Sequence, residues 1–556
     1  MSGSDFDAIV IGSGAGGGAM AWALSSKKIK VLLLESGPAY DPFKDYLLDK
    51  PQWEQTDFPY KANSKGKYSF GQMQELDKRF ADFETFNHVL GKLFKTGIRA
   101  TGTYGHVKGV GGTTLMYSGE AHRMNPEAMK MKSRFQAAAD WPFDYKELEP
   151  YYCIAEQIVG VAGPTADDAK RYRSKPYPLP PHRPSYGSSK IQAGCRKLGM
   201  NFVSNSLGIL SAPYDGRPPC NYCGGCNRGC QRTDKGSVDR TFIPKAVATG
   251  YCTLRAGCQV TGIEAGDNDR IKSVSYVDSK GNIQQVSGRI VVVSCGAIET
   301  PRLLLASSGR HAPDGLCNES GMVGKNFMET LYAITSALHD ERLASYRAAS
   351  ADIICWDYNN PDAIKDVIGG CRFSAATAEA GFAGPLNYAL RVAKGWGKGH
   401  KEQMRQTFGN VISVAAIGEF LPNTKSYIDL DPAAKDASGI PIARINTYNT
   451  EMDLMRLRFM METSRQILFS SGAGKIIEQI STYDSFTSSH VFGTCRMGKD
   501  SRDSVLNAYC QSHRWKNLFV VDASVFPSSG GGESPSLTIE ALAIRTAGYI
   551  AENKST

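Results

Sequence analysis

Four cysteines lie close together near the middle of the chain. The run Cys220-x2-Cys223-x2-Cys226-x3-Cys230 places four thiols within eleven residues. Bacterial ferredoxins bind iron–sulfur clusters with this spacing, although a proline follows their last cysteine and Gln231 stands here. Thiolates this close repel one another unless a metal centre takes up their charge. The pattern predicts an iron–sulfur cluster; the alternatives are structural zinc, which usually takes two separated Cys pairs, and unmetallated thiols.

A glycine-rich turn lies between two apolar runs at the start of the chain. Gly12-x-Gly14-x-x-Gly17 follows the first run and opens a helical stretch, and Glu35 closes the second run, residues 29–35. Such glycines let the backbone approach a pyrophosphate at a helix N-terminus, and the acidic residue takes ribose hydroxyls. The sequence therefore predicts a dinucleotide site on a βαβ unit, but this motif alone does not separate NAD from FAD.

Two further segments could do chemistry. The glycine-rich turn from Gly109 to Thr114 would let the backbone pass close to a flavin ring, or it is an ordinary loop. His490 lies in a run of small residues, Ser488 to Cys495, ahead of the last strand. An imidazole with a pKa near about 6.5 suits a general base at neutral pH. A structural histidine is the alternative.

The elements that must position these residues alternate between two types of pattern. Buried strands followed by helices occupy both ends of the chain, which indicates a doubly wound, parallel α/β lobe. Residues 330–480 mix alternating strands with one long helix at about 449–469, which suits a second, sheet-based lobe. We also expect a helix over 141–163, a long excursion over the cofactor at 40–100, and a C-terminal helix from Pro535 to Ile550.

Composition excludes several classes of protein. The 556 residues are 42% apolar and 21% charged, which is typical of a globular chain. The net charge of +9 is spread without a long basic run, so nucleic acid is not an expected partner. The chain has 14 cysteines, and those outside the cluster are scattered singly, as reduced and buried thiols are.

Targeting signals are not apparent either. No stretch of about 18 apolar residues occurs, so no transmembrane segment is expected. The N-terminus has neither a basic region nor an apolar core ahead of its first strand, so we expect no secretory signal in this chain itself.

Taken together, these motifs resemble the glucose–methanol–choline (GMC) flavoprotein oxidoreductases. The resemblance is carried by Gly12 to Glu35, Gly109 to Arg123, Gly296 to Pro301, Met322 to Met328, His490 to Gly498 and Asn517 to Ile550. It implies FAD rather than NAD, and a Rossmann-like FAD-binding domain joined to a sheet-based (α+β) substrate-binding domain. The implied segments are 1–150, 211–325 and 481–556 for FAD binding, the second with the cysteine loop and the third with catalytic residues, and 151–210 and 326–480 for substrate binding.

The resemblance also implies roles for individual residues. His490 is the expected catalytic base, and its partner position, usually Asn or His, holds Ser534, with Glu533 as an alternative. The expected cofactor-binding residues are Gly12, Gly14, Gly17, Glu35, Val110, Gly112, Thr113, Asp522 and Ser536. Met116 stands where some members attach FAD covalently through a histidine, so FAD should be bound non-covalently. The helix from Pro535 would aim its N-terminal dipole at the reduced flavin.

Within the family, the chain looks most like bacterial glucoside 3-dehydrogenases and related membrane-linked sugar dehydrogenases. This likeness rests on the stretch Gly119 to Pro126, the run at 41–45, and the region from Gly216 to Cys230. In those subunits three cysteines hold a 3Fe–4S centre, and the extra thiol of Cys223 leaves a 4Fe–4S centre open. The likeness implies a small partner subunit that carries the export signal, a cytochrome-type acceptor, and a periplasmic or membrane-associated location through that partner; a cytoplasmic location is the alternative.

The function that the sequence predicts is therefore an FAD-dependent dehydrogenase. It would oxidise a secondary hydroxyl of a sugar or glycoside, at C3 by the family likeness, with His490 taking the hydroxyl proton and a hydride passing to the flavin. Electrons would leave through the cluster to an external acceptor. The alternatives are a GMC oxidase that uses oxygen without a cluster, and a flavin electron-transfer subunit with no alcohol substrate.

Overall fold

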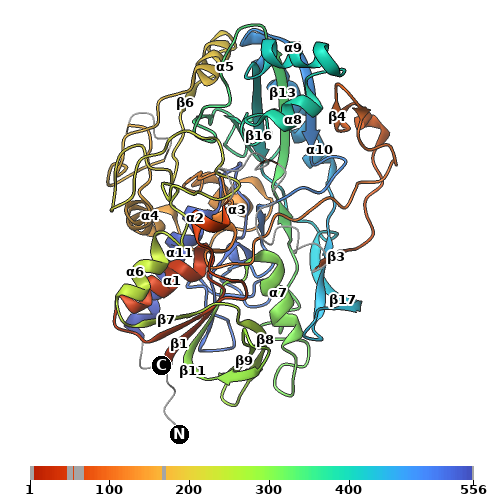
Figure 1. Ribbon diagram of the computed structural model, residues 1–556. Coiled ribbons are helices and arrows are strands. Elements are labelled where there is room, and N and C mark those ends of the chain that lie inside the picture. Colours follow the sequence, from red (N-terminus) through yellow and green to blue (C-terminus); the bar gives the residue numbers. More distant parts are fainter. Residues whose placement is uncertain (1–5, 47–53, 55–67, 166–170, 554–556) are drawn as a thin grey trace.

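The computed structural model describes residues 6–46, 54, 68–165 and 171–553. Two layered lobes, each built on a sheet, lie one above the other in Figure 1. The fold is the mixed α/β architecture that the sequence predicts, with a parallel sheet in one lobe and a large antiparallel sheet in the other.

The lower lobe is built on a five-stranded parallel sheet with the order β21-β11-β1-β2-β7. Its strands are β1 (Phe6–Ile11), β2 (Val31–Leu34), β7 (Cys252–Arg255), β11 (Gly288–Val293) and β21 (Leu518–Val520). Helix α1 (Ala15–Ser25) packs against α11 (Ser536–Glu552) and α6 (Phe242–Ala248). Residues 8–11 and 31–34 are buried throughout, because both faces of a parallel sheet are covered. The predicted βαβ unit is confirmed.

A small antiparallel sheet extends this lobe at the bottom of Figure 1. Its strands are β8 (Gln259–Ala265), β9 (Ile271–Val277) and β10 (Ile283–Val286). The turn at Gly281, whose φ is +85°, joins β9 to β10. Strands β8 and β10 each pair antiparallel with β9.

The upper lobe is built on an eight-stranded sheet with the order β5-β4-β19-β13-β16-β15-β14-β6. Its strands are β4 (Phe86–Asn87), β5 (Gly91–Lys92), β6 (Phe202–Ser204), β13 (Leu331–His339), β14 (Ile353–Cys355), β15 (Cys371–Ala375), β16 (Val411–Gly418) and β19 (Ala473–Ser481). The long helix α10 (Glu451–Ser470) packs across β13 and β16. It begins at Thr450, whose hydroxyl accepts a bond from the Asp453 N–H in a capping box.

The expected excursion over the cofactor at 40–100 lies partly outside the described residues, but Tyr68 lines the cavity and the described part adds strands to two sheets. Strands β4 and β5 join the upper sheet, and β3 (Tyr68–Phe70) pairs with β18 (Pro441–Asn446), itself paired with β17 (Tyr427–Lys435). The first implied FAD-binding segment, 1–150, therefore supplies strands to both lobes. Hydrophobic alternation over two or three residues is too short to be read from sequence.

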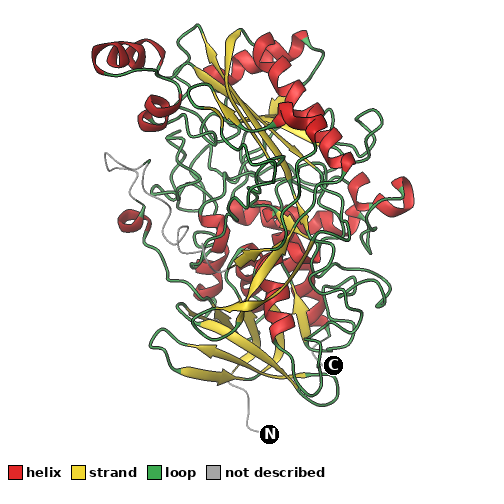
Figure 2. Cartoon of the chain, turned by 90° about the vertical axis from the view of Figure 1, so that its right-hand side faces the viewer, coloured by secondary structure: helices red, strands yellow, loops and turns green. Residues whose placement is uncertain are grey.

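The remaining described elements are short or connect the lobes (Figure 2). They are α2 (Pro42–Asp45), α3 (Met131–Phe135), α4 (Tyr145–Val159), α5 (Tyr186–Lys197), α7 (Gly296–Ala306), α8 (Pro385–Arg391), α9 (Gly397–Thr407), β12 (Met328–Glu329), β20 (Val491–Phe492) and the 3-10 turns Lys78–Phe83, Gly112–Leu115, Glu127–Met129 and Ala523–Val525. Helix α4 occupies the centre of the predicted 141–163 helix and ends at Gly160, in the left-handed region.

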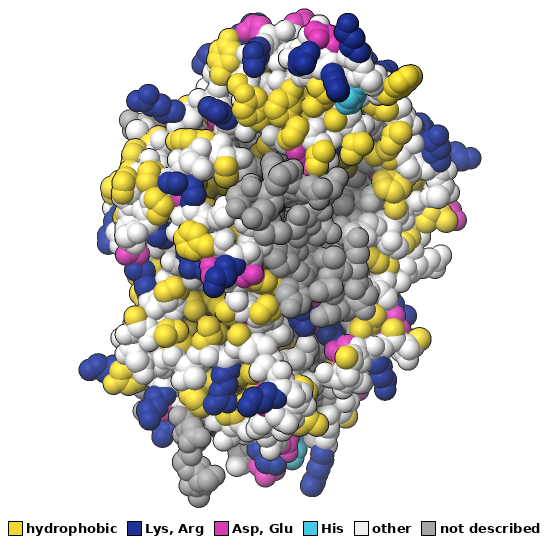
Figure 3. All heavy atoms as spheres, in the orientation of Figure 1, with side chains coloured by type: hydrophobic (Ala, Val, Ile, Leu, Met, Phe, Trp, Pro, Cys, Tyr) yellow, Lys and Arg dark blue, Asp and Glu magenta, His cyan; other side chains and the backbone are white. Residues whose placement is uncertain are grey.

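The surface agrees with the charge pattern of the sequence. Figure 3 shows Lys and Arg side chains scattered over the visible face, with acidic side chains between them, rather than gathered in one stripe. Within the described part of the chain, no helix is both long enough and apolar enough to cross a membrane.

Candidate active site

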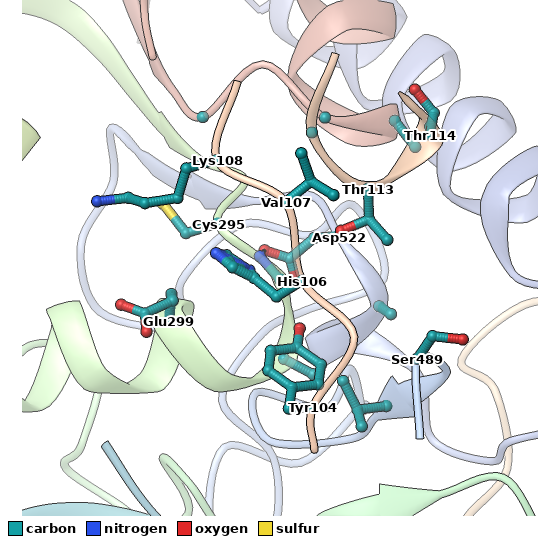
Figure 4. A pocket seen from close by; sticks show the side chains of 18 of the residues that line it. Tyr104, His106, Val107, Lys108, Thr113, Thr114, Cys295, Glu299, Ser489 and Asp522 are labelled. Atoms are coloured by element: carbon teal, nitrogen blue, oxygen red, sulfur yellow. Dashed lines mark hydrogen bonds between the residues drawn. The ribbon is translucent and has the colours of Figure 1, made fainter. Parts of the chain in front are cut away.

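One cavity of about 540 Å³ is lined by residues of both lobes. Its cofactor end lies at the first turn of α1, and its other end is lined by Tyr332 of β13 and Ile417 of β16. Figure 4 shows part of this cavity, with Tyr104, His106, Thr113 and Asp522 around the open space. The cavity thus joins the predicted nucleotide site to the predicted catalytic histidine.

The first glycine turn forms a tight backbone cradle. Gly12 has φ +90°, and a Cβ there would lie 2.5 Å from the Ser294 carbonyl oxygen. A Cβ on Gly17 would lie 1.8 Å from the Gly12 oxygen, so Gly17 permits the close turn rather than lining the cavity. Gly14 caps α1 without a side-chain bond, which leaves the first N–H groups of the helix available to an anion.

Two carboxylates are held at the cavity wall by backbone and hydroxyl donors. The Oε2 atom of Glu35 accepts bonds from the Ser13 N–H at 3.0 Å and the Ser13 hydroxyl at 2.7 Å. The Oδ2 atom of Asp522 accepts bonds from the Gly296 N–H at 2.9 Å and the Thr300 hydroxyl at 2.6 Å. Both side chains line the cavity and are fixed before any ligand enters.

The second glycine turn contacts the first. Gly112 has φ +54°, and a Cβ there would lie 2.8 Å from the Gly14 Cα, so the two turns need glycine to meet. Gly112 and Thr113 line the cavity, as does Ser536 at the first turn of α11. Val110 is buried behind the wall, where its N–H donates to the Pro38 carbonyl at 2.9 Å.

His490 lines the same cavity as the nucleotide cradle. Its backbone carbonyl accepts bonds from the Thr330 N–H at 3.0 Å and the Ser488 hydroxyl at 2.8 Å, which leaves the partly buried ring at the cavity wall. Burial lowers the pKa of His490 to about 4, with Glu120 opposing and Arg372 reinforcing the shift. The imidazole is therefore neutral at pH 7, and its pKa is lower than the ordinary value that the sequence alone suggests.

Ser534 is held by two residues that sequence reasoning missed. Its hydroxyl donates to Glu120 Oε2 at 3.0 Å, and its N–H donates to His122 Nδ1 at 3.0 Å. The Nε2 atom of His122 lies 2.9 Å from the side-chain oxygen of Asn205. Because Nδ1 accepts a bond, the ring proton is on Nε2 and donates to Asn205. Burial lowers the pKa of His122 to about 4, so this ring is neutral as well.

A buried ion pair organises this end of the site. The guanidinium of Arg372 donates to Glu120 Oε2 at 2.5 Å and to the carbonyl of Gly532 at 3.0 Å. Burial alone would raise the pKa of Glu120, but Arg372, His122 and Ser534 together outweigh burial and hold the pKa well below its ordinary value. Glu120 and His122 lie within the stretch quoted for the glucoside 3-dehydrogenase likeness, whereas Arg372, on β15, carries no motif.

The four clustered cysteines lie near one another, but in the described part of the chain they do not form a group that could hold a metal ion. The Cys230 thiol donates to Asp234 at 3.1 Å, the Cys220 sulfur accepts from the Tyr222 N–H at 3.3 Å, and Cys223 is exposed. Cys226 is buried, which raises the pKa of its thiol to about 11. Among the described residues, no group of three or more His, Cys, Asp or Glu side chains could hold a metal ion. The arrangement therefore does not support the predicted iron–sulfur ligation, because the loop directs its thiols to separate partners.

The cysteine loop nevertheless borders the active-site cavity. Asn227 lines the cavity, and the buried amine of Lys235 donates to the carbonyls of Cys226 at 2.6 Å and Leu115 at 2.9 Å. This amine ties the cysteine loop to the second glycine turn.

A nucleotide cradle and a histidine that line one cavity suit a cofactor-dependent oxidoreductase. Models of the GMC oxidoreductase family match residues 91–331 and 422–543. The chain belongs to this family.

Known proteins that resemble the chain along its length agree with this assignment. The chain is 29% identical to 2-methyl-1,2-propanediol dehydrogenase of Mycolicibacterium austroafricanum, covering 99% of this chain and 96% of that protein. It is 27% identical to the fructose dehydrogenase large subunit of Gluconobacter japonicus, covering 98% and 97%. The solved structure of pyridoxine 4-oxidase from Mesorbium loti superposes with a TM-score of 0.62 at 17% identity, covering 99% and 100%. The protein is thus an enzyme of the GMC dehydrogenase and oxidase group, which acts on alcohol or sugar CH–OH groups.

The residues present fit FAD, the cofactor of this family. The two touching glycine turns leave a cradle that a Cβ on Gly12 or Gly112 would obstruct, and the uncapped N-terminus of α1 suits a pyrophosphate. Glu35 offers a fixed carboxylate for ribose hydroxyls. Met116 lines the cavity and has no nucleophilic nitrogen, so non-covalent binding stays the prediction.

Proposed function

We propose that the protein is an FAD-dependent dehydrogenase that oxidises a secondary hydroxyl of a sugar or glycoside, at C3, to a ketone. The observation that carries this proposal is the neutral imidazole of His490 in the same cavity as the nucleotide cradle, beside a polar wall formed by Glu120, Ser534 and Tyr332. Relatives named as dehydrogenases of a diol and of fructose support a polyol substrate.

His490 receives the proton of the substrate hydroxyl. When bound, FAD supplies the acceptor for the hydride that leaves the carbinol carbon. The imidazole is neutral because burial disfavours its cationic form, so it is ready to accept a proton at neutral pH. Once protonated, the imidazolium faces the Glu120 carboxylate, which favours the charged form, while Arg372 opposes it. The Glu120–Arg372 pair therefore limits how strongly the ring holds the proton.

Ser534 and His122 position this wall rather than transfer protons. The Ser534 hydroxyl already donates to Glu120, and its N–H donates to His122, so both groups are committed in the resting enzyme. Helix α11 begins two residues later, at Ser536, and its first turn lines the cavity. Its N-terminal N–H groups favour negative charge that builds up in the cavity.

Our proposal for the electron acceptor is an external protein, with a small subunit as partner and a periplasmic or membrane-associated location. One relative is named as a large subunit, which supports a multi-subunit assembly. The iron–sulfur cluster remains a prediction from the cysteine spacing, and no step is assigned to it, because the described residues form no group that could hold a metal ion. Native mass of the chain produced together with its genomic neighbours tests the partner; full acceptor activity of the chain alone would count against it.

Anaerobic flavin bleaching tests the enzymatic proposal. Oxidised holoenzyme is mixed with methyl glycosides, free sugars and polyols, and flavin absorbance is followed. We expect bleaching with a sugar or glycoside and a primary isotope effect when deuterium replaces the hydrogen on C3. Bleaching without an isotope effect at C3 would refute that position. Peroxide formed at turnover rates in air would favour the oxidase, and no bleaching with any alcohol would favour the electron-transfer subunit.

A further inference from the structure

A second carboxyl group, Glu379, lines the catalytic end of the cavity. It lies between β15 and α8 and shares the wall with Ser118, Tyr332 and His490. The Ser118 side chain hydrogen-bonds to this carboxyl group. Neither the glycine motifs nor the histidine motif includes Glu379, and the proton transfer described above does not use it.

The charges facing Glu379 distinguish it from Glu120. Burial raises the pKa of Glu379 to about 7, the Glu120 carboxylate adds to the rise, and Arg372 opposes it. Arg372 is already paired with Glu120 at 2.5 Å, so Glu379 is left beside an ionised neighbour. The remaining titratable groups on this wall are neutral at pH 7, because burial raises the pKa of Tyr332 and lowers the pKa of His490.

We propose that Glu379 is a substrate-binding residue that holds a hydroxyl of the sugar other than the one oxidised, and that it does so as a neutral carboxyl group. This inference rests on the proposed sugar or glycoside substrate. A protonated carboxyl has one donor and one acceptor, the pair that a hydroxyl requires. A carboxylate here would be a second negative charge next to Glu120 in a wall that substrate closes to water.

Proton linkage sets the direction of the pH dependence. Substrate displaces water from Glu379 and makes its ionised form costlier, so binding favours the protonated form. Affinity is then full below a pH of about 7 and falls as the pH rises above it, by at most about tenfold per pH unit for a single proton. His490 and His122, with pKa values near 4, do not titrate in this window.

The test compares three variants in anaerobic stopped-flow reduction of the holoenzyme flavin. Glu379→Gln keeps a neutral donor and acceptor but cannot ionise, and Glu379→Ala removes both. Glu419→Gln is the matched control, because burial also raises the pKa of Glu419 to about 7 but this residue does not line the cavity. The dependence of the reduction rate on the concentration of the best methyl glycoside gives Kd and the limiting rate separately, from pH 6 to 8.5.

We expect the wild-type Kd to rise as the pH increases above 7. The Kd of Glu379→Gln should change by no more than about twofold between pH 6 and 8.5. Glu379→Ala should weaken binding by about three- to tenfold at pH 6, the worth of one neutral hydrogen bond, with an unchanged limiting rate. Glu419→Gln should keep the wild-type profile. A wild-type Kd that is flat with pH, or a Glu379→Ala variant with the wild-type Kd at pH 6, would overturn the role of Glu379 alone. A holoenzyme that no sugar or glycoside reduces would overturn the proposed function and this inference together.

Discussion

Removing the side chain of His490 is the most direct perturbation of the proposed chemistry. A positioned base contributes about 10²–10⁴ in rate, so His490→Ala should lower the limiting rate of flavin reduction by that factor, or about 2.7–5.4 kcal/mol in activation free energy. The fold should survive, because Thr330 and Ser488 bond the backbone carbonyl of His490 and not its ring. FAD content should also be unchanged, because the glycine cradle and Glu35 are held by contacts that do not involve the His490 ring.

The lowered pKa of His490 adds a second, independent part to this prediction. A base with a pKa near 4 is neutral throughout pH 6–9, so the limiting rate at saturating substrate should be flat there and fall only as the pH approaches 4. Stopped-flow reduction at several pH values, with flavin content measured for each sample, provides the assay. His311→Ala, at a half-buried site beside Asp267, is the control for substitution of a histidine outside the cavity.

Two results would refute this reasoning. Near-wild-type reduction by His490→Ala would show that another group takes the hydroxyl proton. A fall in the limiting rate of the wild-type enzyme below about pH 6.5, absent from His490→Ala, would show that His490 is the base. It would also show that the ring is far better solvated than its place in the cavity wall implies.

The other predictions concern the neighbours of this histidine, the cofactor and the cysteine loop. Ser534→Ala should slow reduction by no more than about tenfold, because Arg372 still pairs with the Glu120 carboxylate; a loss as large as that of His490→Ala would make the hydroxyl a catalytic partner. Because Met116 replaces the histidine that links FAD in some family members, acid precipitation should release all the flavin into the supernatant. Flavin that stays with the pelleted protein would contradict non-covalent binding. The cysteine spacing predicts iron and acid-labile sulfide that Cys226→Ser loses, whereas anaerobically purified protein with flavin and no iron would decide for unmetallated thiols. Because the buried His122 stays neutral while an unfolded histidine binds a proton near pH 6.5, Tm should fall as the pH drops from about 6.5 towards 4, and less steeply in His122→Asn.

The parts of the fold that could be predicted from sequence are those in which local pattern and backbone chemistry agree. The turn at Gly12 requires a positive φ and a close contact with a carbonyl, so only glycine fits there. The glycine pattern between two apolar runs therefore predicts a βαβ unit of a parallel sheet. The long helix α10 is predictable for the same reason, because its capping box at Thr450 marks its start.

The missed parts depend on contacts between distant segments. Glu120 and Arg372 are 252 residues apart in sequence, and only the sheet of the upper lobe brings them to 2.5 Å. His490 and Ser534 both line the cavity, but the Ser534 hydroxyl bonds to Glu120, and the catalytic partnership of the two residues stays a prediction. The spacing of the four cysteines does not tell in which direction each thiol points. Spacing limits how far apart residues of a loop can lie, but it does not set the orientation of their side chains.

The nucleotide-binding lobe combines elements from early and late parts of the chain. Strand β1 and strand β21 both border β11, and α1 packs on α11, so the lobe is complete only with residues from Leu518 onward. During synthesis, the first βαβ unit therefore leaves the ribosome long before β21 and α11 are translated. Until α11 is available, the apolar face of α1 against which it packs must be shielded from water by other contacts. A frameshift or a stop codon ahead of Leu518 would for this reason remove cofactor binding, because it deletes β21 and α11 from the lobe.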